Sequence, residues 1–309
     1  MNNQISSLKN REIYFDKFIK DVPFSGYKLC PGLFIVDIPE EYFDNILNAT
    51  RLFITKVSTK KSTIFKDYVL DELIRSEKFT KLECITPSGM ILPKVYSSFE
   101  YNILMKAFYD LMRDMNLDIE SWYSIMPLRF KASYKENYKP GIQYSHEPHL
   151  DSWTGFSNYA YCAFLPILGD LNNNYIEFWE PTNGIEENWI AGFKSQFERK
   201  EILKNFKKID FKLKPGQLAL ADSYIVHNTA ILNNAGPRIG IDNLFRPAWA
   251  EKNNHIENIY RTSDLRSHQE VCEIGLKSYY DFIDDDEIRR PSQGGLKSPV
   301  GYRFVELKI

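Results

Sequence analysis

The sequence is poor in the features that mark exported or nucleic-acid-binding proteins. Its 309 residues include four cysteines, which are widely spaced and form no C-x-x-C pair, so neither a zinc knuckle nor a disulfide scaffold is expected. Lys and Arg number 39 against 41 Asp and Glu, which gives a net charge of -2 and no cationic excess to neutralise a phosphate backbone. We therefore expect reduced, mostly buried cysteines and no nucleic-acid partner.

Long hydrophobic runs are also missing. The longest apolar run, at about residues 159–168, is well short of the roughly 20 residues that cross a bilayer. The first 16 residues mix Asn, Lys, Arg and Glu and lack the apolar centre of a secretory signal. These absences predict a cytoplasmic protein with no membrane partner. With 43% hydrophobic residues the chain has enough apolar material for a sizeable core.

The first 120 residues show mixed helix and strand patterns. A short apolar run at 33–36 favours a strand, and the stretches 39–53 and 66–79 favour helices. The clearest helix is expected at 98–115, where apolar residues recur at spacings of three and four and give one apolar face. These apolar residues are Tyr101, Leu104, Met105, Phe108, Leu111 and Met112. This helix is expected to pack against a sheet.

Between about residues 122 and 247 the pattern changes to short runs rich in Tyr, Phe, Ile and Trp, separated by Pro, Gly and Asn. Strands are expected at 125–134, 159–167, 175–179, 210–213, 217–221 and 239–246. Such a series is typical of an antiparallel barrel or jelly roll. We expect an α+β, β-dominated fold in one continuous domain, with a supporting region at 1–120, the β core at 121–250 and a C-terminal extension at 251–309.

A long polar segment at 181–208 interrupts the strands. Connections of this length inside a compact domain are usually functional or mobile, so the segment is a candidate lid. Residues 194–214 carry eight Lys or Arg against three acids. The simplest interpretation of this excess is a solvated helix face, and the alternative is a lid that grips an anionic group.

Histidine is scarce as well: the five are His146, His149, His227, His255 and His268. His149 and Asp151 are two residues apart, so on an extended strand both side chains would leave the same face and converge on one ion. His227 follows a β-branched run and can supply a third ligand. Two imidazoles and one carboxylate leave coordination positions open, which suits non-heme Fe(II) in oxygenases.

The same residues are compatible with alternatives to this iron site. Zinc sites of this composition commonly use H-E-x-x-H on a helix, whereas His146-Glu147-Pro148-His149 has a different spacing and contains a proline. His146 is a rival to His149 as a ligand, although a supporting or surface position suits it better. The polar residues could also be ordinary hydrogen-bonded core groups.

An arginine follows the last candidate ligand. Arg238 lies eleven residues after His227, in a Gly-Pro turn that leads into a strand. A guanidinium in this position can hold a carboxylate through two hydrogen bonds, a contact worth roughly 1.5–3 kcal/mol. The distal carboxylate of 2-oxoglutarate fits this requirement.

The combination His149-x-Asp151, then His227, then Arg238 resembles the signature of the Fe(II)/2-oxoglutarate-dependent dioxygenase superfamily. The resemblance covers about residues 122–250 and implies a double-stranded β-helix, or jelly roll. It also implies Fe(II), 2-oxoglutarate and O2 as cofactors, with release of succinate and CO2. Residues 164–167, 174–180 and 233–246 are similar to the branch that includes phytanoyl-CoA-type and streptomycin-biosynthesis-type oxygenases.

The sequence departs from the family pattern at one position. Many members carry Ser or Thr two residues after the arginine to help hold 2-oxoglutarate, but this chain has Gly240. Another residue must then provide that contact, and the candidates are Tyr144, Asn158 and Thr229.

The substrate is less determined than the metal ligands. Asp151 fills the position that halogenating relatives leave open for chloride, which favours hydroxylation, with desaturation or epimerisation as alternatives. Trp153, Tyr161, Trp179 and Arg246 are candidate substrate contacts, although strand aromatics are more often core residues. The resemblance favours a small polar metabolite, such as a sugar or an amino-acid-derived intermediate. Two further classes are a non-catalytic jelly-roll binding protein and a cupin-type zinc or manganese hydrolase, which would have no need of Arg238.

Overall fold

The computed structural model describes residues 8–86, 89–123, 125–132, 146–154, 157–182, 189–190, 195–251, 265–283 and 301–307. The helices in these ranges are α1 (Leu8–Ile19), α2 (Glu40–Thr59), α3 (Asp67–Arg75), α4 (Glu77–Thr80), α5 (Ser98–Asp114), α7 (Gln196–Leu203), α8 (Ala248–Glu251) and α9 (His268–Cys272), with 3-10 turns η1 (Val95–Ser97) and η2 (Asp151–Thr154). The strands are β1 (Gly26–Cys30), β2 (Leu33–Asp37), β3 (Met90–Ile91), β4 (Ile119–Tyr123), β5 (Leu128–Lys131), β6 (Tyr161–Gly169), β7 (Asn174–Pro181), β8 (Phe206–Lys208), β9 (Gln217–Asp222), β10 (Val226–Ile231), β11 (Arg238–Pro247), β12 (Leu265–Ser267), β13 (Ser278–Ile283) and β14 (Gly301–Glu306).

The strands form two facing sheets and a separate hairpin, and these strands pair with one another in antiparallel fashion. The main sheet has the order β1-β2-β9-β6-β11-β4-β12, and β5 also pairs with β11 and carries β3. The smaller sheet has the order β10-β7-β8, and β13 pairs with β14. The expected sheet-rich, antiparallel α+β architecture is confirmed.

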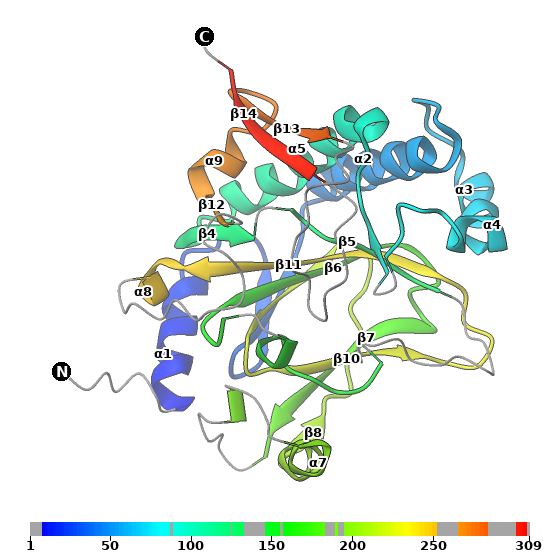
Figure 1. Ribbon diagram of the computed structural model, residues 1–309. Coiled ribbons are helices and arrows are strands. Elements are labelled where there is room, and N and C mark those ends of the chain that lie inside the picture. Colours follow the sequence, from blue (N-terminus) through cyan, green and yellow to red (C-terminus); the bar gives the residue numbers. More distant parts are fainter. Residues whose placement is uncertain are drawn as a thin grey trace.

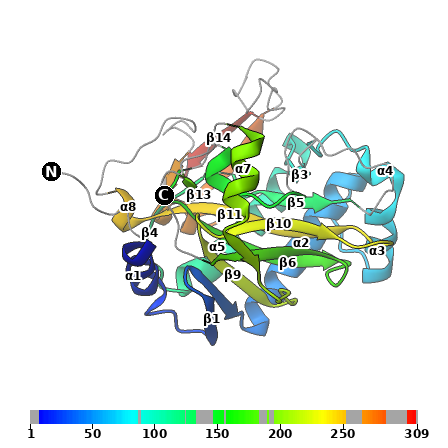
Figure 2. The same cartoon turned by 90° about the horizontal axis from the view of Figure 1, so that it is seen from below.

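The two sheets and the helices form layers. Helices α2 and α5 cover one face of the main sheet, and the smaller sheet lies on its other face (Figure 1). A large apolar core fills the space between these helices and the sheet, whereas a smaller one, which includes Phe164 and Phe178, lies between the sheets. Helix α7 lies beyond the smaller sheet and is nearest the reader when the molecule is seen from below (Figure 2). Strands β6 and β11 are thus covered on both faces.

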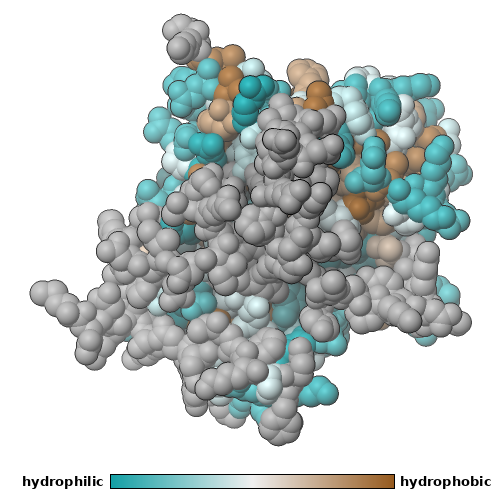
Figure 3. Space-filling model, in the orientation of Figure 1, coloured by the Kyte–Doolittle hydropathy of each residue, from teal (hydrophilic) through white to brown (hydrophobic). Residues whose placement is uncertain are grey.

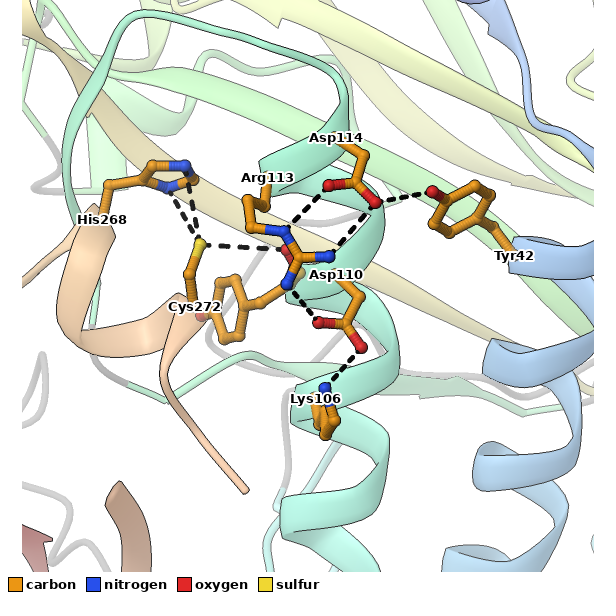
Figure 4. Close-up of polar contacts among 8 residues, drawn as sticks. Tyr42, Lys106, Asp110, Arg113, Asp114, His268 and Cys272 are labelled. Atoms are coloured by element: carbon orange, nitrogen blue, oxygen red, sulfur yellow. Dashed lines mark hydrogen bonds and ion pairs between the residues drawn. The ribbon is translucent and has the colours of Figure 1, made fainter. Parts of the chain in front are cut away.

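The helical layer also contains a polar network on α5 (Figure 4). Arg113 donates to Asp110 at 2.8 Å and to Asp114 at 2.8 Å. Tyr42 of α2 donates to Asp114 at 2.6 Å and so links the two helices. In the view of Figure 3 the hydrophobic residues that reach the surface lie mainly over this upper, helical half.

Several predicted elements agree with the structure and others need correction. The helices expected at 39–53 and 98–115 and the strands expected at 33–36, 217–221 and 239–246 are present. The helix expected at 66–79 is interrupted, because Ser76 has an extended backbone and its hydroxyl accepts from the Phe79 amide as the N-cap of α4. The strand expected at 125–134 is confined, in the described range, to β5, and β4 precedes it.

One expected strand was wrong and one helix was missed. No strand forms at 210–213: Leu213 is buried between the sheets and Phe211 packs beside it, but the ladder is built instead by β8. The sequence indicated no particular element at the N-terminus, yet α1 buries Phe15 and Phe18 against the main sheet. The polar composition of this segment concealed two well-spaced aromatic residues.

The expected state of the cysteines is confirmed. All four are free, and Cys30, Cys84 and Cys162 are buried. None of the helices in the described part of the chain combines the length and apolar composition needed to cross a bilayer.

Candidate metal centre

The two histidines and the aspartate singled out in the sequence come together between the sheets. One ligand atom from each of His149, Asp151 and His227 lies within 4.8 Å of the others. The His227 Nε2 atom is 3.7 Å from Asp151 Oδ1, and the two imidazole centroids are 4.6 Å apart. The three side chains therefore converge on a volume that a single ion could occupy.

The backbone fixes the two imidazoles relative to each other. The His149 N–H donates to the His227 carbonyl at 3.0 Å, and the His227 N–H donates to the His149 carbonyl at 3.0 Å. This isolated antiparallel bridge extends the edge of β10 by one residue pair. The relative placement of two candidate ligands is thus set by strand pairing.

Asp151 reaches the site by a different route from the one expected. The sequence suggested one extended strand through His149 and Asp151, but the chain leaves the strand after His149 and Asp151 begins η2. The Trp153 N–H donates to the Leu150 carbonyl at 3.0 Å and closes the turn. The turn, not a strand alternation, brings the carboxylate back toward the histidines.

Hydrogen bonds at the imidazole rings determine which nitrogen faces the site. His149 Nδ1 lies 2.8 Å from the Glu147 carbonyl, and His227 Nδ1 lies 3.3 Å from the Ile225 carbonyl. A carbonyl oxygen only accepts, so each Nδ1 carries the proton and each Nε2 keeps its lone pair. In this tautomer Nε2 is free to bind a metal ion.

Burial changes the proton affinity of all three groups. It lowers the pKa of His149 to about 4, with a further contribution from His227, and lowers the pKa of His227 to about 4. It also raises the pKa of Asp151, against the opposing effect of His149. Both imidazoles are therefore neutral at physiological pH, while the partly buried carboxylate gains from a nearby cation.

A narrow gap with room for about one water molecule lies between the sheets next to these groups. Asp151 and His227 line it together with apolar side chains from β6, β9 and β11, among them Phe164, Ala221 and Leu244. The Phe164 ring lies 4.8 Å from the His227 ring. The polar cluster therefore has an apolar wall on its main-sheet side.

The arginine predicted to hold a carboxylate opens β11. Arg238 is only 4% exposed, and its Nε has no hydrogen-bond partner among the described residues. Burial lowers its pKa to about 10, against the opposing effect of Asp242. A buried guanidinium with an unused donor is costly unless an anion or another acceptor meets it.

A second buried basic residue beside Arg238 was not predicted. Lys131 on β5 is the direct partner of Arg238 across the two strands and is 8% exposed. Burial, and then the charge of Arg129, lowers the pKa of Lys131 to about 7. The signal was present in the sequence, because β5 alternates apolar Leu128 and Phe130 with the two basic residues.

The inner face of β11 carries further charges. Asp242 accepts from Arg129 Nε at 2.7 Å, so these two charges balance each other. Arg246 lies on the same face beyond Leu244 and is 6% exposed. Along β11, Arg238 therefore lies before Leu244, which borders the gap between the sheets, and Arg246 lies after it.

The candidates for the second 2-oxoglutarate contact are placed differently. Thr229 is two residues after His227 on β10 and so shares its face, and it is 6% exposed. The Asn158 carbonyl accepts from Arg11 at 2.8 Å, in a cluster that also holds Asp222. Tyr144 lies outside the described residues.

Three aromatic substrate candidates are also spread out. Tyr161 is fully buried in the helix-side core, where its hydroxyl accepts from Trp249 at 3.0 Å. Trp179 donates to Asn228 at 2.7 Å on the face of the smaller sheet away from Phe178. Trp153 is half-buried in η2 and donates to the Trp189 carbonyl at 2.6 Å.

The remaining histidines are not part of the cluster of ligand atoms. His146 is described but is not one of the converging groups, and His255 lies outside the described residues. His268 on α9 was expected to be solvated. Instead its Nδ1 accepts from Trp122 at 2.9 Å, and burial lowers its pKa to about 4.

No protein-family model and no curated protein matches the chain. Among solved structures, it is similar to SnoN, a non-heme α-ketoglutarate-dependent epimerase from nogalamycin biosynthesis, at 12% identity over 76% of this chain and 84% of SnoN, with a TM-score of 0.37. It is similar to EctD from S. alaskensis with 2-oxoglutarate and 5-hydroxyectoine, at 12% identity over 71% and 73% of the two chains, with a TM-score of 0.38. A third is an N-substituted L-amino acid dioxygenase from Burkholderia ambifaria, at 14% identity over 76% and 90%, with a TM-score of 0.34.

Proposed function

We propose that this protein is an Fe(II)- and 2-oxoglutarate-dependent oxygenase that oxidises a small polar metabolite. The observation that carries the proposal is the convergence of His149, Asp151 and His227, with both imidazole Nε2 lone pairs free for an ion. A neutral two-histidine, one-carboxylate set suits Fe(II) and leaves coordination positions open.

The buried basic residues support a dicarboxylate as the second component. Arg238 and Lys131 lie opposite each other on adjacent strands, and the neighbouring Arg129 pairs with Asp242. With its pKa lowered to about 7 Lys131 is only partly protonated at neutral pH, and an anion between the two side chains would favour its charged form. The planar fork of Arg238 fits one carboxylate, and Lys131 adds a point charge beside it.

The residues divide the work between binding and orientation. When bound, iron with 2-oxoglutarate and O2 supplies an oxidation that releases succinate and CO2. His149, Asp151 and His227 would hold the metal, and Arg238 would orient the distal carboxylate of 2-oxoglutarate. The apolar wall at Phe164 would exclude water from one side of the site.

The two facing sheets support a finer statement about the fold. We propose that they are the two halves of a double-stranded β-helix, because all their pairings are antiparallel and β10 and β6 face each other at His227 and Phe164. Arg246, on the far side of Leu244 from Arg238 along β11, is a substrate contact in this proposal. A buried guanidinium there favours a polar substrate group.

The test measures succinate and O2 consumption by the purified protein with Fe(II), ascorbate and 2-oxoglutarate. We expect succinate formation that depends on 2-oxoglutarate and is lost in Asp151→Ala. Mn(II) binding by calorimetry supplies a readout independent of turnover. Metal binding without succinate formation from 2-oxoglutarate would instead support a metal hydrolase or a binding protein. Failure to bind Mn(II) would overturn the proposed metal site.

A further inference from the structure

The segment that carries His149 and Asp151 is held from outside by α7. Arg199 on α7 is 4% exposed. Its guanidinium pairs with the carboxylate of Glu147 and donates to the Pro148 carbonyl at 2.8 Å. Both of these acceptors immediately precede His149.

The middle of the segment is held by apolar contacts. Leu150, the residue between the two candidate ligands, is completely buried in a small core with Ile202, Phe206 and Val226. Ile202 belongs to α7 and Val226 to β10, so this core joins the helix to the smaller sheet. Removing a leucine side chain from water stabilises such a contact.

The far end of the segment has a third contact. Trp153, in the turn that begins at Asp151, donates to the carbonyl of Trp189 at 2.6 Å. Trp189 also packs against the same small core as Leu150. The chain just before α7 and α7 itself thus touch the ligand segment before, between and after the two candidate ligands.

These contacts matter because the sheet alone fixes little of this segment. Within the described part of the chain, residues 146–154 pair with a strand only at the bridge from His149 to His227, and the chain turns away directly afterwards. The Glu147 carbonyl also orients the His149 ring through Nδ1. A group that fixes Glu147 therefore acts on the direction of the His149 lone pair.

We propose that α7 is a clamp on the ligand segment, with Arg199 as its positioning residue, so that docking of α7 and binding of the metal ion stabilise each other. The inference rests on the proposed metal site. If docking raises metal affinity, linkage requires that the metal raises the stability of docked α7 by the same factor. Helix α7, which lies within the candidate lid 181–208, would then act on the metal ligands from the outer side of the smaller sheet.

The experiment compares Arg199→Gln with Lys200→Gln, which removes the same charge from the adjacent, exposed position of α7. Calorimetry with Mn(II) alone measures affinity, and hydrogen exchange of the α7 amides with and without Mn(II) measures docking. We expect Arg199→Gln to raise the Mn(II) Kd by about 10- to 100-fold, the usual effect of removing an outer partner of a ligand. Lys200→Gln should stay within about twofold of the wild type, as usual for a surface substitution.

Hydrogen exchange gives the reciprocal readout. Mn(II) should slow exchange of the α7 amides in the wild type and in Lys200→Gln, and much less in Arg199→Gln. If Arg199→Gln fails to fold, Glu147→Gln tests the same ion pair from its half-exposed partner. Equal Mn(II) affinity and equal protection of α7 in the wild type and these variants would overturn the clamp, whereas a wild type that binds no Mn(II) would overturn the metal site itself.

Discussion

The two faces of β11 serve different purposes although both are buried. Ile239, Ile241 and Phe245 point into the core beneath the helices. Arg238 and Arg246, on the other face, point into the space between the sheets and are 4% and 6% exposed. Alternation of apolar and polar residues usually indicates one buried and one solvated face. Here both faces are buried, and the polar face lies on the side of the proposed metal site.

The largest change in the free energy of unfolding should come from a substitution on the face of β11 that points toward the helices. Phe245 is fully buried and its ring lies 4.7 Å from that of Trp122 and 5.6 Å from that of Phe18. Phe245→Ala should lower the free energy of unfolding by about 3–5 kcal/mol because it leaves a cavity in a close-packed core. Urea unfolding followed by circular dichroism measures this loss. A loss below about 1 kcal/mol would mean that the core under α5 is loosely packed.

The next effect concerns the face of β11 that points between the sheets. It should change the affinity for 2-oxoglutarate and not the free energy of unfolding. Arg238→Met removes a buried cation whose Nε lacks a partner among the described residues, so the free energy of unfolding should be unchanged or slightly higher. The affinity for 2-oxoglutarate should fall by about 10- to 100-fold, because a charge-assisted contact of roughly 1.5–3 kcal/mol is lost. Calorimetry measures the affinity for Mn(II) and then, with Mn(II) present, the affinity for 2-oxoglutarate.

A matched control for this substitution lies on the neighbouring strand. Arg129→Met removes a cation that is paired with Asp242, and it should destabilise the protein because a partly buried carboxylate loses its partner. If Arg238→Met were the more destabilising of the two, Arg238 would be a structural residue and the carboxylate anchor would lie elsewhere.

A pH effect is expected from the helix side. Burial, with a smaller contribution from Arg113, lowers the pKa of His268 to about 4 from the usual 6.5. Between pH 6.5 and 4 His268 is therefore protonated in the unfolded chain but neutral in the folded protein. The stability that neutral His268 allows is complete above pH 6.5 and is lost as the pH falls toward 4.

His268→Gln isolates this contribution because the amide oxygen can still accept from Trp122 but does not titrate. The variant should lose less stability than the wild type across that pH window, by at most about 1.4 kcal/mol per pH unit, the slope for one whole proton. Urea unfolding at several pH values measures the two slopes. Parallel slopes would show that His268 is protonated equally in both states.

The smallest effect should come from the exposed side of the helical layer (Figure 4). Asp110 pairs with Arg113 and with Lys106 at 2.7 Å, but all three side chains are partly solvated. Asp110→Asn should change the free energy of unfolding by about 0.2–1 kcal/mol, as for other exposed ion pairs. A loss as large as that of Phe245→Ala would make this network, and not the apolar core, the main support of α5.

Much of the site could be predicted because its chemistry depends on rare residues. With five histidines in the chain, the spacing of His149, Asp151 and His227 was enough to group them, and the structure brings them together. The route could not be predicted in the same way. Asp151 enters through a 3-10 turn, and a two-residue spacing is compatible with either backbone.

The missed features depend on distant contacts. Lys131 becomes part of the charged interior only because β5 pairs with the start of β11. Arg11 on α1 is buried against Asp222, far away in the sequence, and nothing near Arg11 indicates that partner. The sequence places Arg199 among several basic residues expected to be solvated, but in the structure it is buried and paired with Glu147. Local pattern predicts faces and turns, but the partner of a charge is a property of the fold.

The bridge between His149 and His227 joins residues that are made at different times during translation. His149 and Asp151 leave the ribosome well before His227, so the nascent chain first presents only one histidine and one carboxylate from this set. The third side chain is placed only after β10 has been made and has paired with β7. An ion that needs all three ligands can therefore bind only after β10 has been made.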